Sequence, residues 1–270
     1  MRRNLVVILL FCLLGSVLVN AFPVKPETPF KGGEKIRFGI MFKWGAVNTE
    51  LAYADMTLTD TQVDGEPCYH LKLSARTSPF YDTFYHVREN FESWFSKDDQ
   101  RPVKCTRDTE EGNYTAWNRY TYDWVQKVIH ADVNFNGRGD EHYEIPLSKD
   151  VYDLPTLVYH FRTIDASGLK GGERFPFRFA IDDAVFDITL TFVGRETKKV
   201  RKIGMVKTLH FNCSVVGGAL FEGDKPVEIW LADDGTCMPV AFMAPLRVGA
   251  MQGWLKNYQG LKYNFDALVQ

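Results

Sequence analysis

The chain carries six histidines, but no two of them have a spacing that builds a catalytic metal site. None lies four residues from another, so the paired imidazoles that share one helix face in zinc proteases are absent. The serine motif GxSxG and the glycine-rich phosphate-binding motif GxGxxG are also missing. We therefore predict no catalytic residue, no bound metal and no cofactor. The histidines are His70, His86, His130, His142, His160 and His210.

The segment from Asp132 to Glu144 comes closest to a metal-binding loop. It places oxygen-bearing side chains at positions 1, 3, 5 and 9 around Gly137 at position 6, as a calcium loop does. The twelfth residue is Tyr143, however, and the carboxylate of Glu144 comes one position late. Asn136-Gly137 is also a common turn of β-hairpins. We therefore predict a hairpin without a metal.

The N-terminus has the pattern of an export signal. Two arginines precede an apolar run from Leu5 to Val19, and Ala21 ends a small-residue pattern that suits a signal peptidase. The run is shorter than the roughly 20 residues of a membrane-spanning helix, and no later run comes close to that length. We predict a signal peptide at 1–21, cleaved near Ala21, and one mature β-rich domain at 22–270. The mature protein would be periplasmic or secreted, without a transmembrane segment.

The four cysteines of the mature chain would then meet an oxidising compartment, where disulfides persist. No CxxC pair or zinc-site spacing is present, so structural disulfides and buried free thiols both remain open. If disulfides form, we expect Cys68 to pair with Cys105 and Cys213 with Cys237, because each pair lies within one half of the chain.

Composition excludes several classes of protein. The 270 residues include 32 Lys and Arg against 34 Asp and Glu, without a basic run, so the electrostatic footprint of a nucleic-acid binder is absent. Aromatic residues make up 14% of the chain, which is too many for a disordered protein. The mature chain is long enough to form its own core, and we expect a monomer.

Most of the chain alternates apolar and polar residues, which is the pattern of β-strands. Turn sequences such as Asp64-Gly65 and Asn136-Gly137 separate the runs, and such short connections favour antiparallel neighbours. We therefore predict an all-β fold, a long antiparallel meander curved into an open or half barrel. The expected strands are 35–44, 47–59, 67–76, 85–96, 102–109, 113–123, 125–134, 174–181, 184–195, 205–217, 226–232, 237–246 and 250–259.

One short helix is predicted near 153–163. Asp153 can cap its N-terminus, Pro155 suits the first turn, and Leu154, Leu157 and Phe161 fall on one face. We expect this helix to cover or plug the concave face of the sheet.

Aromatic residues are dense between positions 80 and 124. Trp117 points to one face of its strand, while Tyr120 and Tyr122 share the other, so both faces carry apolar side chains. One face must be core, and the other could contact a ligand. The predicted ligand-binding residues are Phe84, Tyr85, Arg88, Phe91, Trp94 and Trp117.

A set of segments spread over nearly the whole mature chain has a recognisable order. The segments are Gly33–Phe38, Phe42–Gly45, Ala52, Tyr69–Leu71, Ala75–Thr77, Phe84–Glu89, Asp150–Asp153, Leu157–Arg162, Gly171–Glu173, Val193–Glu196, Cys213, Ile229–Asp234, Pro239-Val240 and Gly249. Together they resemble one family of bacterial exported proteins, the domain-of-unknown-function family DUF3108, in the family's order. The resemblance implies a mostly β protein of Gram-negative bacteria and supplies no catalytic residues.

These observations predict an exported, non-enzymatic protein that binds an apolar or amphipathic ligand, such as a lipid or an envelope precursor, in the concavity of its sheet. A glycan-binding or protein-binding module of the cell envelope is the first alternative, with Trp94, Trp117 or Trp254 as anchors. An unrecognised hydrolase that uses scattered carboxylates is the second. Those carboxylates are Glu89, Glu92, Asp140 and Glu144.

Overall fold

The computed structural model describes residues 21–44, 47–216, 225–246 and 249–269, and their strands form one sixteen-stranded sheet. The predicted signal peptide, apart from Ala21, lies outside the described residues. The helices are α1 (Pro79–Asp82) and α2 (Leu154–Phe161). The strands are β1 (Lys35–Trp44), β2 (Val47–Val63), β3 (Glu66–Thr77), β4 (Val87–Ser96), β5 (Pro102–Glu111), β6 (Tyr114–Asp123), β7 (Val128–Phe135), β8 (Asp140–Pro146), β9 (Val151–Tyr152), β10 (Arg174–Ile181), β11 (Ala184–Val200), β12 (Gly204–Val216), β13 (Val227–Ala232), β14 (Pro239–Pro245), β15 (Ala250–Gln259) and β16 (Leu268–Val269).

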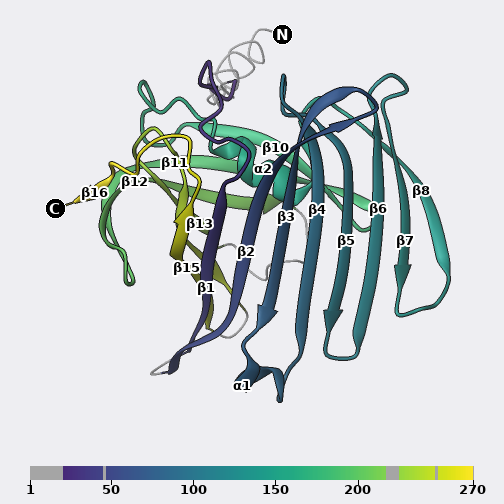
Figure 1. Cartoon of the computed structure of the whole chain (residues 1–270), viewed down its shortest axis with the longest axis horizontal. Helices are drawn as coiled ribbons and strands as arrows, with labels where there is room; N and C mark the ends of the chain where they lie inside the picture. Colours follow the sequence, from purple (N-terminus) through teal and green to yellow (C-terminus); the bar gives the residue numbers. More distant parts are fainter. Residues whose placement is uncertain (1–20, 45–46, 217–224, 247–248, 270) are drawn as a thin grey trace, which may run out of the picture.

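The strand order consists of two meanders rather than one. The first runs outward from β1 to β8, and the second returns from β9 to β15, which pairs with β1. The predicted all-β, open antiparallel sheet is confirmed, but β9 and β10 pair in parallel, and the β1–β15 pairing joins the two ends of the chain. Figure 1 shows β1–β8 as one wall, with β10–β12 crossing behind it. The sheet is therefore strongly curved and has two free edges, β8 and β9.

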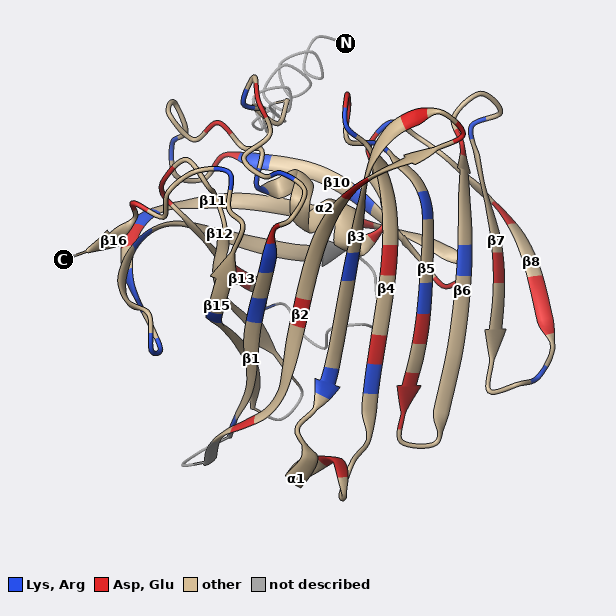
Figure 2. Cartoon of the chain, in the orientation of Figure 1, with Lys and Arg blue, Asp and Glu red and all other residues tan. Residues whose placement is uncertain are grey.

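Alternation along the strands separates a concave core face from an outer face. On β3, Leu71 is buried while its neighbour Lys72 is exposed, and on β4 the buried Phe91 and Phe95 flank the partly exposed Trp94. Because successive side chains of a strand point to opposite faces, the buried set lies inside the curved sheet. Figure 2 shows acidic and basic residues interspersed along β1–β6, so neither sign of charge forms a large patch there.

Helix α2 fills the upper part of the concavity, as predicted. Its N-cap Asp153 is buried, and Oδ1 of Asp153 accepts hydrogen bonds from the backbone N–H of Thr156 at 2.9 Å and the hydroxyl of Ser93 at 2.7 Å. Burial raises the pKa of the Asp153 carboxyl, and these hydrogen bonds oppose that shift. The helix contacts β3, β4 and β10, and its Leu157 and Tyr159 belong to the core.

The C-terminal end of α2 is anchored by a buried ion pair. Arg162 donates to both carboxylate oxygens of Glu34, at 2.5 and 2.9 Å, and neither side chain is accessible to solvent. The hydroxyl of Tyr159 donates to the same carboxylate at 2.7 Å. These contacts tie the helix to the start of β1.

Candidate functional site

The first two predicted ligand-binding residues lie at the tip of the connection between α1 and β4. Phe84 is 76% exposed and Tyr85 is 53% exposed, and Phe80 beside them is also exposed. Arg88 holds both oxygens of Asp82 at 2.7 Å. That pairing keeps the pKa of the Asp82 carboxyl well below its usual range. Arg88 therefore braces the tip through Asp82.

Phe91 and Trp94 point to opposite faces of β4. Phe91 is buried in the core cluster on the concave side. Trp94 lies on the outer face, where the ring of His70 stacks on it at a centroid distance of 4.3 Å and Lys104 lies 5.1 Å from the ring centroid. The indole of Trp94 is thus already covered by side chains of this chain.

Trp117 lies on the outer face of β6, beside a depression of about 320 Å³. Polar side chains from four neighbouring strands surround the indole. They include Asn90, Asp108 and Asn134. The guanidinium of Arg119 lies 5.3 Å from the ring centroid. The six residues that the sequence suggested therefore do not form one wall. They lie at the α1–β4 connection, in the core on the concave side, and on the outer face, because successive side chains of a strand point to opposite faces.

A polar network that the sequence did not predict lies on the concave face. Arg107 on β5 donates to Glu89 at 2.6 Å and to Asp182, in the turn between β10 and β11, at 3.0 Å. Thr109 also donates to Glu89, and the hydroxyl of Tyr120 donates to the backbone carbonyl of Asp182. Burial would lower the pKa of Arg107, but Glu89 and Asp182 raise it above its ordinary value. The network ties the far end of β10 and β11 to β4–β6.

Small and apolar side chains line the concave face beside this network. Ala54 on β2 is directly opposite Ala75 on β3, and Ala75 is directly opposite Glu89 on β4. Ala54 and Ala75 are only partly buried, as are Ile40 and Leu73. α2 contacts β3, β4 and β10, and the ring of its Tyr159 lies 6.2 Å from that of Phe95 on β4. Below the helix, therefore, alanines leave apolar surface on the concave face that the chain's own side chains do not fully cover.

The four cysteines among the described residues are free thiols, so the expected disulfide pairing is not present. Cys68 on β3 and Cys105 on β5 are separated by β4, where their partners are Ser96 and Ser93. Strands two places apart are about 9.5 Å from one another, which exceeds the reach of a disulfide. Cys213 pairs with Val227 at the start of β13, whereas Cys237 follows the end of that strand. The open alternative, free thiols, is the one that the structure has, with Cys68, Cys105 and Cys237 buried and Cys213 partly buried.

The carboxylates that the hydrolase alternative requires do not lie together in one site. Glu89 faces the concavity, while Glu92 lies on the outer face between His70 and Lys72. Asp140 and Glu144 belong to the edge strand β8.

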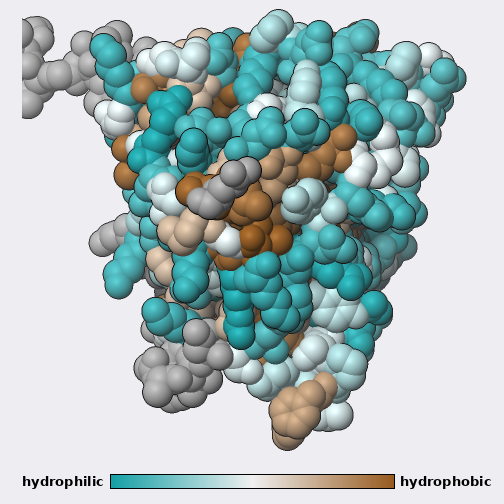
Figure 3. All heavy atoms as spheres, turned by 60° about the vertical axis from the view of Figure 1, so that its left-hand side comes forward, coloured by the Kyte–Doolittle hydropathy of each residue, from teal (hydrophilic) through white to brown (hydrophobic). Residues whose placement is uncertain are grey.

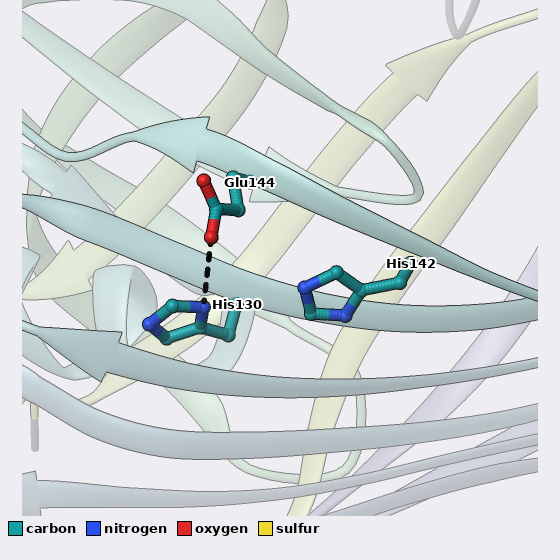
Figure 4. Close-up of side chains that lie close together, drawn as sticks. All are labelled: His130, His142 and Glu144. Atoms are coloured by element: carbon teal, nitrogen blue, oxygen red, sulfur yellow. Dashed lines mark ion pairs between the residues drawn. The ribbon is translucent and has the colours of Figure 1, made fainter.

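The calcium-like segment forms the β7–β8 hairpin, as expected. Asn136 and Gly137 both have positive φ, at 54° and 66°, in the turn. The register places His130 opposite Glu144 and Asp132 opposite His142. Figure 4 shows His130, His142 and Glu144 close together on one side of the hairpin. The alternation of side chains along each strand places His130 with Asp132 on one face of β7, and His142 with Glu144 on one face of β8. Which of them lie opposite one another depends on the length of the loop between the strands.

None of the described helices is long and apolar enough to span a membrane. Apolar side chains are nevertheless exposed on β12 and β16, among them Met205, Leu268 and Val269. Figure 3 turns this side of the molecule forward and shows an apolar patch there.

Comparison with known proteins identifies the fold and the family. A crystal structure of a β-barrel-like protein of the domain-of-unknown-function family DUF1849 from Brucella abortus matches with a TM-score of 0.53 and 9% identity, over 87% of this chain and 100% of that one. A Bacteroides fragilis protein with a YmcC-like fold gives a TM-score of 0.32 and 7% identity, over 89% and 100%. No curated protein matches the sequence. The model of the family described as "Protein of unknown function (DUF3108)" matches residues 37–255, so the chain belongs to the DUF3108 family.

Proposed function

We propose that this chain is an exported, non-enzymatic, monomeric protein that binds an apolar or amphipathic ligand on the concave face of its sheet. The sequence pattern of an export signal at residues 1–21 supports the location. The observation that carries the binding proposal is the partly exposed apolar surface formed by Ile40, Ala54, Leu73 and Ala75 below α2. Apolar surface of this kind on a curved sheet suits an acyl chain.

The polar network gives this surface a chemically distinct end. Ala75 is directly opposite Glu89, and Glu89 is bound to Arg107, which also holds Asp182. Two carboxylates around one guanidinium leave an excess of negative charge, which favours a ligand head group that is cationic or donates hydrogen bonds. An amphipathic molecule would lie with its apolar part on the alanines and its polar part beside Glu89.

A fluorescent fatty amine offered to the purified mature protein tests this proposal. The wild-type protein should show a saturable rise in fluorescence. Ala75→Trp should abolish it, because the indole would cover the concave surface. Lys72→Trp is the matched control, since Lys72 is on the same strand, faces outward and is 57% exposed. No saturable signal with the wild-type protein, or an equal signal from A75W and K72W, would contradict the proposal.

Glycan binding at Trp117 is the second candidate, and the depression beside that indole favours it. Asn90, Asp108 and Asn134 surround the ring with hydrogen-bonding groups, and sugars are bound by aromatic stacking with such groups around it. Titration with a chitooligosaccharide should change the tryptophan fluorescence. Trp117→Ala should remove the response, whereas Trp94→Ala should keep it, because His70 and Lys104 already cover Trp94. An unchanged response in W117A would exclude this site.

A further inference from the structure

The outer face of the β7–β8 hairpin gathers two imidazoles and two carboxylates. Ile129, Ala131 and Val133 of β7 are buried, so the alternate positions His130 and Asp132 point away from the core. The antiparallel register adds Glu144 directly opposite His130, and His142 directly opposite Asp132. All four side chains remain at least one-third exposed to solvent.

The distances fit a metal ion after small side-chain rotations. One ligand atom from each of His130, His142 and Glu144 can be chosen so that all three lie within 4.8 Å of one another. Nδ1 of His130 is 3.9 Å from Oε1 of Glu144, and the two imidazole rings are 6.1 Å apart at 18°. Tetrahedral zinc with bonds of about 2.0–2.1 Å requires ligand atoms about 3.3 Å apart. Exposed side chains on a paired hairpin can close that difference by rotation, without a change in the backbone.

Asp132 supplies the outer support that metal-binding histidines usually have. Its Oδ1 lies 2.8 Å from Nδ1 of His142. When Nδ1–H donates to this carboxylate, the lone pair of the ring is on Nε2, which is then free to bind a metal. Asp132 and Glu144 also add two negative charges, which attract a divalent cation.

We propose that His130, His142 and Glu144 form a binding site for a divalent transition-metal ion of the Zn²⁺ type, with Asp132 orienting His142. Two imidazoles and one carboxylate are ligands that Zn²⁺ prefers, whereas Ca²⁺ would require more oxygen ligands. Three protein ligands leave one coordination position for water. The site lies on the outer face of the sheet, and Arg107 and Glu89 on the concave face take no part in it.

Competition of the purified chain with a chromophoric chelator for Zn²⁺ tests the site. The wild-type protein should bind one Zn²⁺ per chain at this site. His130→Gln and His142→Gln should each weaken binding at least tenfold, since loss of an outer-shell partner alone typically costs about 10–100-fold. Asp132→Asn should weaken binding less than either. His86→Gln is the matched control, because His86 also lies on the surface between two carboxylates, Asp82 and Glu110. The Zn²⁺ affinity of this variant should equal that of the wild type.

Co²⁺ in place of Zn²⁺ reports the ligand type. Visible d–d bands without a thiolate charge-transfer band are expected, and the H130Q/H142Q double variant should lose them. Equal affinity of the wild type and the double variant would overturn the proposal. A thiolate band would also overturn it, because the metal would then be on a cysteine. Metal binding at this site does not depend on lipid or glycan binding, so failure of one proposal leaves the other standing.

Discussion

Arg162 and Glu34 form an ion pair that solvent does not reach, although 128 positions separate them in the chain. The guanidinium also lies 5.2 Å from the ring centroid of Phe30 and 4.7 Å from that of Tyr159. Removal of one partner would leave the other as an uncompensated charge in a medium of low polarity. The pair therefore controls how firmly α2 is held against the start of β1.

Arg162→Met is expected to lower the free energy of unfolding by about 3–5 kcal/mol, the usual cost of breaking a buried pair from one side. Arg37→Met is the control, because Arg37 pairs with Asp55 at the surface with 51% and 35% of the side chains exposed. Such surface pairs contribute about 1 kcal/mol or less. Urea unfolding followed by circular dichroism measures both variants. Equal losses of unfolding free energy in R162M and R37M would show that the buried Arg162–Glu34 pair stabilises the fold no more than a surface pair does.

Stability is expected to fall as the pH drops from 6.5 to 4, and His160 should contribute to that fall. Burial lowers the pKa of His160 to about 4, while Nδ1 of His160 lies 3.3 Å from Oε1 of Gln100 and Nε2 lies 3.3 Å from the hydroxyl of Tyr152. Between these pH values the unfolded chain binds a proton at His160 that the folded chain does not, so protons favour unfolding.

The contribution of His160 is at most about 3 kcal/mol, at 1.36 kcal/mol per pKa unit. His160→Gln should therefore reduce the dependence of unfolding free energy on pH in this window. The buried Asp153, whose pKa is raised, titrates with the opposite sign and is present in both proteins. The difference between the two stability curves isolates His160, and parallel curves would refute its role.

The thiols should react slowly in the native protein. Burial raises the pKa of Cys213 to about 12 and raises the pKa values of Cys68, Cys105 and Cys237 above their ordinary value. Brief iodoacetamide treatment at pH 8 should modify none of them in the folded mature chain and all four in denaturant. Intact-mass spectra count the additions. A mass lower by about 2 Da per pair before treatment would reveal disulfides instead.

Gly253 is expected to tolerate no larger residue while Phe242 keeps its position. A Cβ atom on Gly253 would lie 1.9 Å from Cε1 of Phe242, on the neighbouring strand β14. Gly253→Ala should therefore cost about 1–3 kcal/mol through overpacking. Phe242→Ala removes all of the clashing ring atoms, so the double variant should be more stable than the sum of the two single losses predicts. Thermal or urea unfolding of all four proteins gives this coupling, and strict additivity would contradict the contact.

Much of the local structure follows from the sequence. Alternation predicts β1, β10 and β15 with their observed bounds, and the Asp153 cap with Pro155 predicts α2. The hairpin turn at Asn136-Gly137 is predicted, but its second strand, β8, is missing from the expected strands, because its inward apolar residues are only Tyr143 and Ile145 among charged neighbours. The ligand-binding residues suggested by aromatic density did not converge, since density along the chain does not specify which face or which end of a strand a ring occupies.

Most of the strands, the short helix α2 and the polarity of each face can be predicted from the sequence, because they depend on side chains within a few positions of one another. The pairing of β15 with β1, the contact between Glu34 and Arg162, and the sharing of Arg107 by Glu89 and Asp182 join distant parts of the chain and are visible only in the tertiary structure. The His130–Glu144 pairing also depended on it. The loop at 136–139 sets the register, and a shift of one residue would move every side chain of β8 to the opposite face.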